Sequence, residues 1–208
     1  MPSALAPHIA PSEPLTLRER TRLAMRAEVI EVAFRLFTEQ GFEQTTVEQI
    51  AAEAGLSRTT FFRYFGTKEE LVLGRISELG LKIAAALRAR PETEHPWVAL
   101  RRAFDVVTEF DTTNAGEHQK FMRLLDDACR VRTQEWERTQ GWQSVLAPET
   151  SRRLGLAADP AAPQGAALAA SASACLYVAT DVFMNSEDPC ISLGTLLDDA
   201  MGAVSPLT

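Results

Sequence analysis

Apolar residues recur at three- and four-residue spacing along most of the chain, and alternating runs of β-branched residues are missing. This spacing is typical of amphipathic helices, whereas alternation would indicate strands. The first such segment covers about Leu17–Gln40, and Gly41 follows it as a natural helix stop. The pattern therefore predicts an all-α fold.

Two short helices are predicted next along the chain. Thr45 followed by Glu48 matches a capping box, which begins a helix that Gly55 ends. Ser57 is a good N-cap for a second helix, which extends only to about Tyr64. Two short helices joined by a Gly-Leu-Ser turn form the helix-turn-helix pattern.

The later helices are longer and their ends are less clearly marked. Thr67 and Glu70 form another capping box, which begins a helix that runs toward Leu87. The segment 90–96 holds two prolines and several polar residues, so it interrupts the helices. Beyond it we expect helices over residues 97–110, 116–128, 131–146 with an extension toward 154, 164–184 and 193–204.

Composition restricts the classes of protein that this chain can represent. The 46% of hydrophobic residues is ordinary for a folded globular protein, and no run approaches the roughly 18 apolar residues of a membrane span. The three cysteines lack CxxC spacing and the three histidines are scattered, so we expect reduced thiols, a cytoplasmic location and no metal site. Phosphate-binding glycine loops and catalytic constellations are missing from the sequence, so we expect neither a cofactor nor an enzyme.

The net charge of −7 at first counts against a nucleic-acid partner. Its distribution weakens that objection, because residues 18–75 carry nine basic and nine acidic side chains. Residues 76–208 carry twelve basic and eighteen acidic side chains, so the acidity lies mainly there. Residues 1–17 are rich in proline and lack a signal-peptide pattern, and we interpret them as a flexible arm.

The second short helix carries the side chains that point to DNA. Its first turn offers Arg58, Thr59 and Thr60, of which the arginine suits a bidentate contact to guanine and the threonine methyls suit thymine. Phe61 and Phe65 are four residues apart and are expected to face inward. A helix with this polar face suits the major groove.

Other basic and hydroxyl side chains flank this helix. We expect phosphate contacts from Thr46, Tyr64 and Lys68. In the arginine-rich segment 18–26, Arg22 is a candidate for a backbone or minor-groove contact. The alternative for that segment is a solvated helix face whose arginines pair with neighbouring glutamates.

Residues 37–72 resemble the DNA-binding domain of the TetR family of bacterial transcriptional regulators. The resemblance implies an all-α homodimer that binds a palindromic double-stranded DNA operator, usually as a repressor. It also implies a C-terminal domain that binds a small-molecule effector, with the last two helices at the dimer interface. It rests on Phe37, Gly41, Phe42, Thr45, Thr46, Ile50, Ala51, Ala54, Gly55, Leu56, Ser57, Phe62, Tyr64, Phe65, Lys68 and Leu71.

The chain departs from the family pattern at one position of interest. Many members have tyrosine where this chain has Phe62, and the tyrosine hydroxyl often contacts the DNA backbone. Phe62 cannot make that hydrogen bond, so it packs on DNA or belongs to the core, and the neighbouring Arg63 is a candidate to compensate. With the resemblance, the chain divides into an N-terminal arm (1–17), a helix-turn-helix domain (18–66) and an effector-binding and dimerisation domain (67–208).

The larger domain offers only general candidates for its two roles. Wide apolar side chains are candidate pocket walls, with plain core packing as the alternative for each: Phe104, Phe121, Met122, Leu125, Trp136, Trp142 and Tyr177. The last two helices are rich in alanine, serine and leucine, which suits a helix–helix seam either between two chains or within one. The residues predicted for the dimer interface are Leu176, Phe183, Leu193, Leu196, Leu197 and Met201.

Two other classes of protein stay open at the level of sequence. An α-helical enzyme with a helix-turn-helix-like subdomain is opposed by the missing nucleophile–base and metal sets. An adaptor whose N-terminal helices bind a protein is favoured by the acidic balance but opposed by the family pattern and by the predicted exposure of Arg58.

Overall fold

The computed structural model describes residues 16–108, 119–120, 122–123, 135–156, 163–188 and 190–207. Within these ranges the regular elements are helices, which confirms the all-α class. Their bounds are α1 (Leu17–Gln40), α2 (Val47–Glu53), α3 (Arg58–Phe65), α4 (Lys68–Ala89), α5 (Pro96–Ala103), α6 (Asp105–Thr108), α8 (Glu135–Arg153), α9 (Pro163–Asn185) and α10 (Leu193–Val204).

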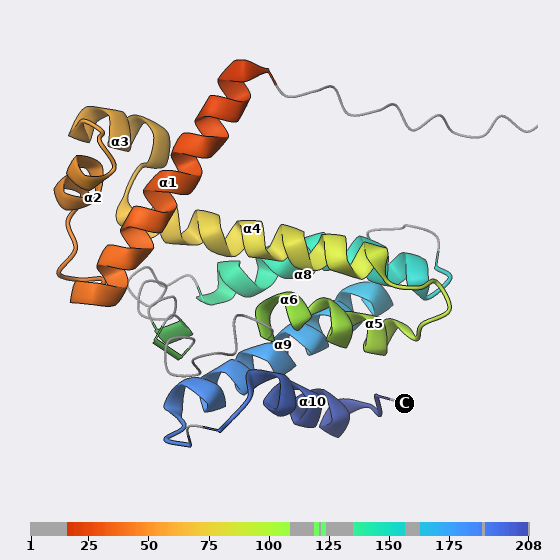
Figure 1. Ribbon diagram of the computed structural model, residues 1–208. Coiled ribbons are helices and arrows are strands. Elements are labelled where there is room, and N and C mark those ends of the chain that lie inside the picture. Colours follow the sequence, from red (N-terminus) through yellow and green to blue (C-terminus); the bar gives the residue numbers. More distant parts are fainter. Residues whose placement is uncertain are drawn as a thin grey trace, which may run out of the picture.

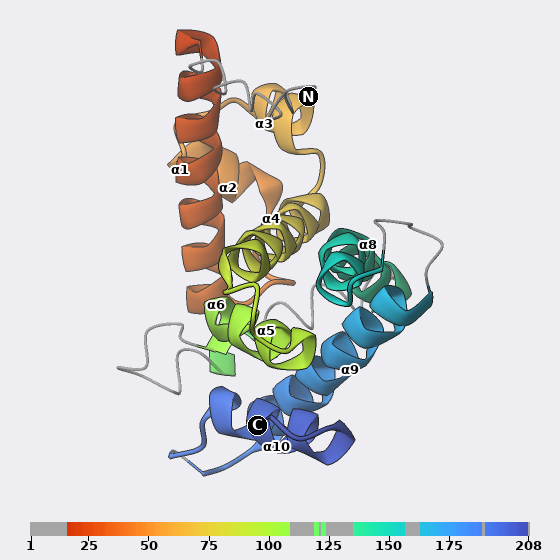
Figure 2. The same ribbon diagram turned by 90° about the vertical axis from the view of Figure 1, so that its right-hand side faces the viewer.

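The helices form two groups that share α4 (Figure 1). Helices α1, α2 and α3 lie at the N-terminal end of α4. The C-terminal part of α4 belongs to the second group, with α5, α6, α8, α9 and α10. In both ribbon views α10 lies at the opposite end of the molecule from α3 (Figure 2). Helices α2 and α3 thus lie at one extremity of the protein.

Most predicted boundaries that fall within the described residues agree with the structure, and the helix after residue 96 differs. The helix expected over 97–110 is divided at Phe104 into α5 and α6. The Phe104 amide donates to the carbonyls of both Leu100 and Arg101 at 3.2 Å, and the Phe104 carbonyl accepts from the Val107 amide at 2.8 Å, so three-residue hydrogen bonds accompany the four-residue ones there. Helix α8 is described from Glu135 and runs through Pro148 to Arg153, in agreement with the predicted extension toward residue 154, and the predicted start at residue 131 lies outside the described residues. Most of the helix expected over 116–128 lies outside the described residues.

The start of α2 corrects one sequence prediction. The N-cap is Thr46, whose hydroxyl accepts a hydrogen bond from the Gln49 amide at 3.2 Å, while the Gln49 side chain accepts from the Thr46 amide at 2.8 Å. Thr45 is buried instead, and its hydroxyl donates to the Gly41 carbonyl at 2.8 Å. The capping box therefore lies one residue later than predicted, and it leaves the Glu48 carboxylate free of any capping role.

The starts of α3 and α4 are as predicted. Ser57 accepts a hydrogen bond from the Thr60 amide at 3.1 Å, and Thr67 and Glu70 form a reciprocal capping box. Gly55, in the turn between α2 and α3, has φ of 68°, a left-handed conformation that glycine adopts without steric cost. The turn and caps together fix the direction of α3.

Two hydrophobic cores organise the chain, and α4 contributes to both. Phe37, Ile50 and Phe61 belong to the first core, together with residues of α4 up to Ile76. The second core begins on α4 at Ile83 and continues through the helices of the C-terminal region. Because one continuous helix enters both cores, a displacement of α4 in the second core also displaces its residues in the first core.

Trp142 of α8 lies where the two cores meet. Its ring packs against both of them, and its indole Nε1 donates to the Ile76 carbonyl of α4 at 3.1 Å. Gly80 makes room for this ring, because a methyl group there would lie 2.5 Å from Cδ1 of Trp142. Met122 also packs against both cores.

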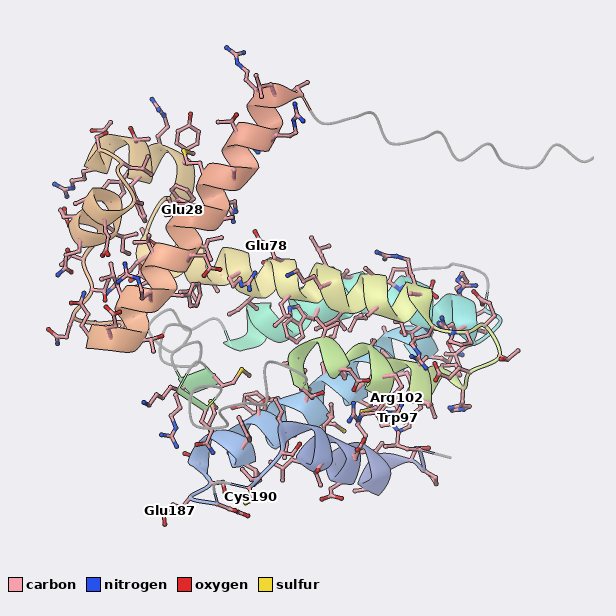
Figure 3. All side chains as sticks on the ribbon, viewed as in Figure 1. Glu28, Glu78, Trp97, Arg102, Glu187 and Cys190 are labelled. Atoms are coloured by element: carbon pink, nitrogen blue, oxygen red, sulfur yellow. The ribbon has the colours of Figure 1, made fainter. Side chains whose placement is uncertain are left out.

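Polar contacts at helix ends hold the arrangement together. Arg153 of α8 is buried and donates to the carbonyls of Leu87 and Arg90 at 2.8 and 2.7 Å, which binds the end of α4 to α8. Trp97, labelled in Figure 3, lies next to α10 and donates to the Ser205 carbonyl at 3.1 Å. Helices α4, α8 and α10 are thus tied to their neighbours at specific carbonyls.

The close approach at Gly80 gives a test of this packing. Gly80→Ala should lower the free energy of unfolding by about 1–3 kcal/mol, because the added methyl group collides with the Trp142 ring. Gly202→Ala is the matched control, since a methyl group at that helical position meets nothing within 4 Å. The control should raise stability by about 0.5–1 kcal/mol through helix propensity. Urea denaturation measures both, and equal effects of the two substitutions would contradict the packing described.

Candidate nucleic-acid interface

Two aromatic side chains fix α3 against the first core. Phe61 and Phe65 are buried, and their ring centroids lie 5.3 Å apart. This confirms the inward orientation predicted from their four-residue spacing. The helix therefore cannot rotate without exposing both rings. Its exposed residues are Arg58, Thr59, Phe62, Arg63 and Tyr64.

The three predicted base-reading residues differ in exposure. The Arg58 side chain is 67% exposed, and Thr59 is also exposed. Thr60 is half-buried, and its hydroxyl lies 2.8 Å from the Ser57 hydroxyl at the N-cap. Arg58 and Thr59 thus present the most accessible polar groups of the first turn.

Arg58 has two neighbours that sequence reasoning did not connect with it. Its Nε lies 2.8 Å from Oε1 of Glu48 on α2, and its guanidinium carbon lies 5.4 Å from the centre of the Phe62 ring. Phe62 is 42% exposed, so it belongs to the outer surface and not to the core. In the sequence, the contact could be anticipated only from the position of the α2 cap, which decides whether the Glu48 side chain is used for capping. That cap was predicted one residue too early.

The other end of α3 presents a second cation–aromatic pair. The guanidinium carbon of Arg63 lies 4.8 Å from the centre of the Tyr64 ring, which is 44% exposed. Tyr64 also lines a cleft of about 680 Å³ against the first two turns of α1, where Arg18 and Arg22 contribute to the lining. The structure thus brings Arg22, predicted from the sequence, next to Tyr64.

Thr46 is exposed at the N-terminus of α2, where its side chain serves as the cap. Helix α2, which Thr46 caps, and helix α3, which carries Arg58, Arg63 and Tyr64, lie at the same end of the molecule (Figure 1). Helix α1 is joined to α4 behind this surface by an ion pair between Arg26 and Glu78, with 3.2 Å between Nε and Oε1; Glu78 is labelled in Figure 3.

Lys68 has a structural role that the sequence did not reveal. Its Nζ donates to the carbonyls of Phe42 and Thr45 at 2.7 and 3.2 Å, and it lies 4.3 Å from the centre of the Phe42 ring. The ammonium group thus binds the loop between α1 and α2, which carries Thr46. Its predicted contact to a phosphate stays a prediction.

Lys68→Met tests this role. The substitution keeps an apolar stem on Phe42 but removes the hydrogen bonds to the loop, so it should lower the free energy of unfolding by about 1–3 kcal/mol. Lys82→Met on the same helix is the control, because Lys82 is exposed and a surface change of this kind stays within about 0.5 kcal/mol. Chemical denaturation followed by circular dichroism measures both, and an unaltered midpoint for Lys68→Met would contradict the role.

The candidate pocket residues are placed in different environments. Phe104 is fully buried in the second core, and Tyr177 is exposed on α9. Met122 and Trp142 lie half-buried at the junction of the two cores. Phe121, Leu125 and the side chain of Trp136 lie outside the described residues, so no pocket wall is assigned to them.

Most residues predicted for a dimer interface are buried within the single chain. Leu196 is half-buried, and the other five belong to the second core: Leu176, Phe183, Leu193, Leu197 and Met201. For these five the structure shows intramolecular packing, which was the alternative left open by the sequence. The exposed apolar side chains of α9 are different ones, namely Tyr177, Val178 and Val182.

Two features bear on other functions. In the described part of the chain, no group of three or more histidine, cysteine or acidic residues is arranged to hold a metal ion. Helix α9 is long and apolar enough by composition to cross a membrane, but 44% of its most apolar 18-residue stretch is buried in the protein. Core helices of soluble proteins have the same character, so we interpret α9 as one of them.

Comparison with known families gives two matches. The profile described as bacterial regulatory proteins of the tetR family matches residues 29–74, and the profile of the MftR C-terminal domain matches residues 94–207. The first covers the helix-turn-helix and the beginning of α4. The second covers more than half of the chain, from the end of the α4–α5 connection through α10.

Curated relatives are transcriptional regulators. The chain is 34% identical over 149 residues to the HTH-type transcriptional regulator TcmR of Streptomyces glaucescens, which is 69% of this chain and 66% of TcmR. It is 32% identical over 127 residues to the HTH-type transcriptional repressor AcnR of Corynebacterium diphtheriae, which is 55% of this chain and 66% of AcnR. The matched regions thus span about two thirds of these relatives.

Solved structures share the fold. A tetR-family transcriptional regulator from Streptomyces coelicolor superposes with a TM-score of 0.60 at 16% identity, over 89% of this chain and 80% of that one. The repressor FadR of Thermus thermophilus, solved with lauroyl-CoA, gives 0.56 at 20% identity, over 88% of this chain and 95% of that one.

The fold, the exposed short helix and both profile matches agree with each other. The chain belongs to the TetR family and is a DNA-binding transcriptional regulator.

Proposed function

We propose that the protein is a homodimeric repressor that binds a palindromic DNA operator through α3 and is released by a small-molecule effector. The observation that carries this proposal is the placement of α3. Phe61 and Phe65 anchor it inward, while Arg58 and Thr59 face outward at one extremity of the molecule. We also propose that residues 18–66 form the DNA-binding domain and residues 67–208 the effector-binding and dimerisation domain.

The proposed contacts divide into two kinds. Arg58, Thr59 and Thr60 would face base edges in the major groove, where each base pair has a distinguishable pattern of donors and acceptors. The second kind would contact phosphates, which fixes the register of the helix without reading the sequence. It comprises Thr46, Arg22, Arg63, Tyr64 and Lys68.

The proposed dimer uses the outer face of α9. Val178 and Val182 are four residues apart and exposed, so they form one apolar strip on the helix, and Tyr177 is exposed on an adjoining face. A second copy of the chain would cover this strip and bring two α3 helices to the spacing of one DNA turn, roughly 34–36 Å. Helix α10 packs beside α9 and would complete the interface.

The proposed effector acts where the two cores meet. Met122 and Trp142 are half-buried there, and the Trp142 indole donates a hydrogen bond to the Ile76 carbonyl of α4. A ligand that prefers a different position of α8 would move α4 with it, because Arg153 also holds the end of α4. Its differential affinity for the two positions sets how much operator binding weakens. The apolar surroundings favour an effector with an apolar portion, and FadR, a structural neighbour, is solved with lauroyl-CoA.

Arg58→Ala tests the base-reading role. The substitution should relax the preference at one base pair of each half-site by about 1–3 kcal/mol, which is the usual value of a bidentate arginine–guanine contact. Gel-shift titrations of the operator and its single-base variants measure this preference.

Arg63→Ala is the matched control on the same helix, since Arg63 is proposed to contact a phosphate. It should weaken binding to every sequence alike. The slope of the logarithm of the binding constant against the logarithm of salt concentration should fall by about one, because one fewer counterion is released. Identical, sequence-independent losses for both substitutions would contradict base reading by Arg58.

Val178→Asp tests the proposed dimer. The side chain is 53% exposed, so a carboxylate is tolerated in the single chain but would be buried and unpaired in the dimer. The variant should sediment as a monomer in analytical ultracentrifugation while keeping its helical circular dichroism. Leu81→Asp is the control, because Leu81 on α4 is 57% exposed and lies outside the proposed interface. A monomeric wild-type protein would exclude the dimer altogether.

A further inference from the structure

The Arg58 guanidinium lies between groups from two helices. The Glu48 carboxylate on α2 approaches its Nε at 2.8 Å, and the Phe62 ring, one turn along α3, lies with its centre 5.4 Å from the guanidinium carbon. A ring at this distance attracts a guanidinium through its quadrupole. An arginine with two oriented neighbours is restricted to fewer rotamers than an arginine in free solvent.

We propose that Glu48 and Phe62 are positioning residues for Arg58, and that they sharpen the base preference of the protein without contacting a base themselves. This inference rests on the proposed function of α3 as the reading helix. It assigns a role to the phenylalanine that replaces the tyrosine common in the family. It also assigns a role to a carboxylate that lies in the first turn of α2, two residues after the capping residue Thr46.

The geometry leaves the reading end of Arg58 available. The close contact to Glu48 is made by Nε, and the terminal nitrogens have no hydrogen bond to another residue of the described part of the chain. Those two nitrogens are the pair that can bind O6 and N7 of guanine in a bidentate contact. The carboxylate therefore orients the side chain and does not block it.

The exposure of the pair argues against a role in stability. The side chains of Arg58 and Glu48 are 67% and 55% exposed, and ion pairs so open to solvent contribute little to folding. Their effect on recognition is different, because a side chain that is already oriented loses less rotamer freedom when it binds. Restricting Arg58 before binding thus favours the one base pair that matches its geometry.

The charge of Glu48 adds to this selectivity. A carboxylate in the first turn of α2 lies close to the surface proposed to meet the phosphates, and it repels DNA of any sequence. At a matching site the oriented Arg58 contact offsets that repulsion. At other sites the repulsion has no compensation, so Glu48 lowers non-specific binding relative to operator binding.

Glu48→Gln tests the inference, because it removes the charge and keeps the shape of the side chain. Gel-shift titrations with the operator and each single-base variant should show the discrimination at one base pair falling by about three- to tenfold, a part of the roughly 5- to 150-fold of a full bidentate contact. That base pair should be the one at which Arg58→Ala loses preference. Phe62→Leu should relax the same base pair, and Phe62→Tyr, which keeps the ring, should retain the preference there.

Glu53→Gln is the matched control. Glu53 lies on the same helix, is 42% exposed and pairs with Arg35 on α1, away from α3. Its substitution removes the same charge and should raise binding to all sequences slightly, with no change at any one base pair. The contrast separates orientation of Arg58 from the general effect of charge.

Three outcomes would overturn the inference. In the first, Glu48→Gln changes binding to all sites equally, as Glu53→Gln does. In the second, it changes the preference at a base pair other than that of Arg58, which makes Glu48 a base reader. In the third, Phe62→Leu leaves the preference intact. The proposed function fails separately, if the wild-type protein shows no sequence preference or Arg58→Ala leaves every preference unaltered.

Discussion

The burial of Phe61 and Phe65 in the first core is the constraint on which the rest of the structure depends. Helix α3 has only eight residues, which is too short to be stable alone, so its orientation comes from these two rings. With both rings inside, Thr59 and Arg63 face outward, and the cap at Ser57 makes Arg58 the first residue of the helix, where its side chain is exposed. The surface that we propose for reading DNA therefore depends on an apolar contact made by the same short helix.

Much of the fold could be predicted because it depends on local signals. The caps at Ser57 and Thr67 and the prolines near residue 91 mark helix ends through short-range hydrogen bonds and steric restrictions, and the structure agrees with them. At α2 two adjacent threonines both matched the cap pattern. The choice between them depended on a tertiary feature, the burial of Thr45 against Gly41, which the sequence pattern does not contain.

The functional surfaces were less predictable because apolar side chains look alike in sequence whether they face the core or a partner. Leu197 and Met201 have the spacing of a helix–helix seam, and the structure uses that seam inside one chain. The exposed residues Val178 and Val182 occupy the same helix as buried ones. The contacts of Glu48 and Lys68 cross between helices and depend on the packing of α2 and α4, so neither could be read from local spacing.

Selection of bound fragments from random double-stranded DNA by the purified protein tests the central claim most directly, because it requires both an outward α3 and a second copy of the chain. The account predicts an enriched palindrome whose half-sites are separated centre to centre by about one helical turn, roughly 10–10.5 base pairs, or a multiple of it. Recovery of fragments without a shared motif, or with a single unrepeated half-site, would contradict it.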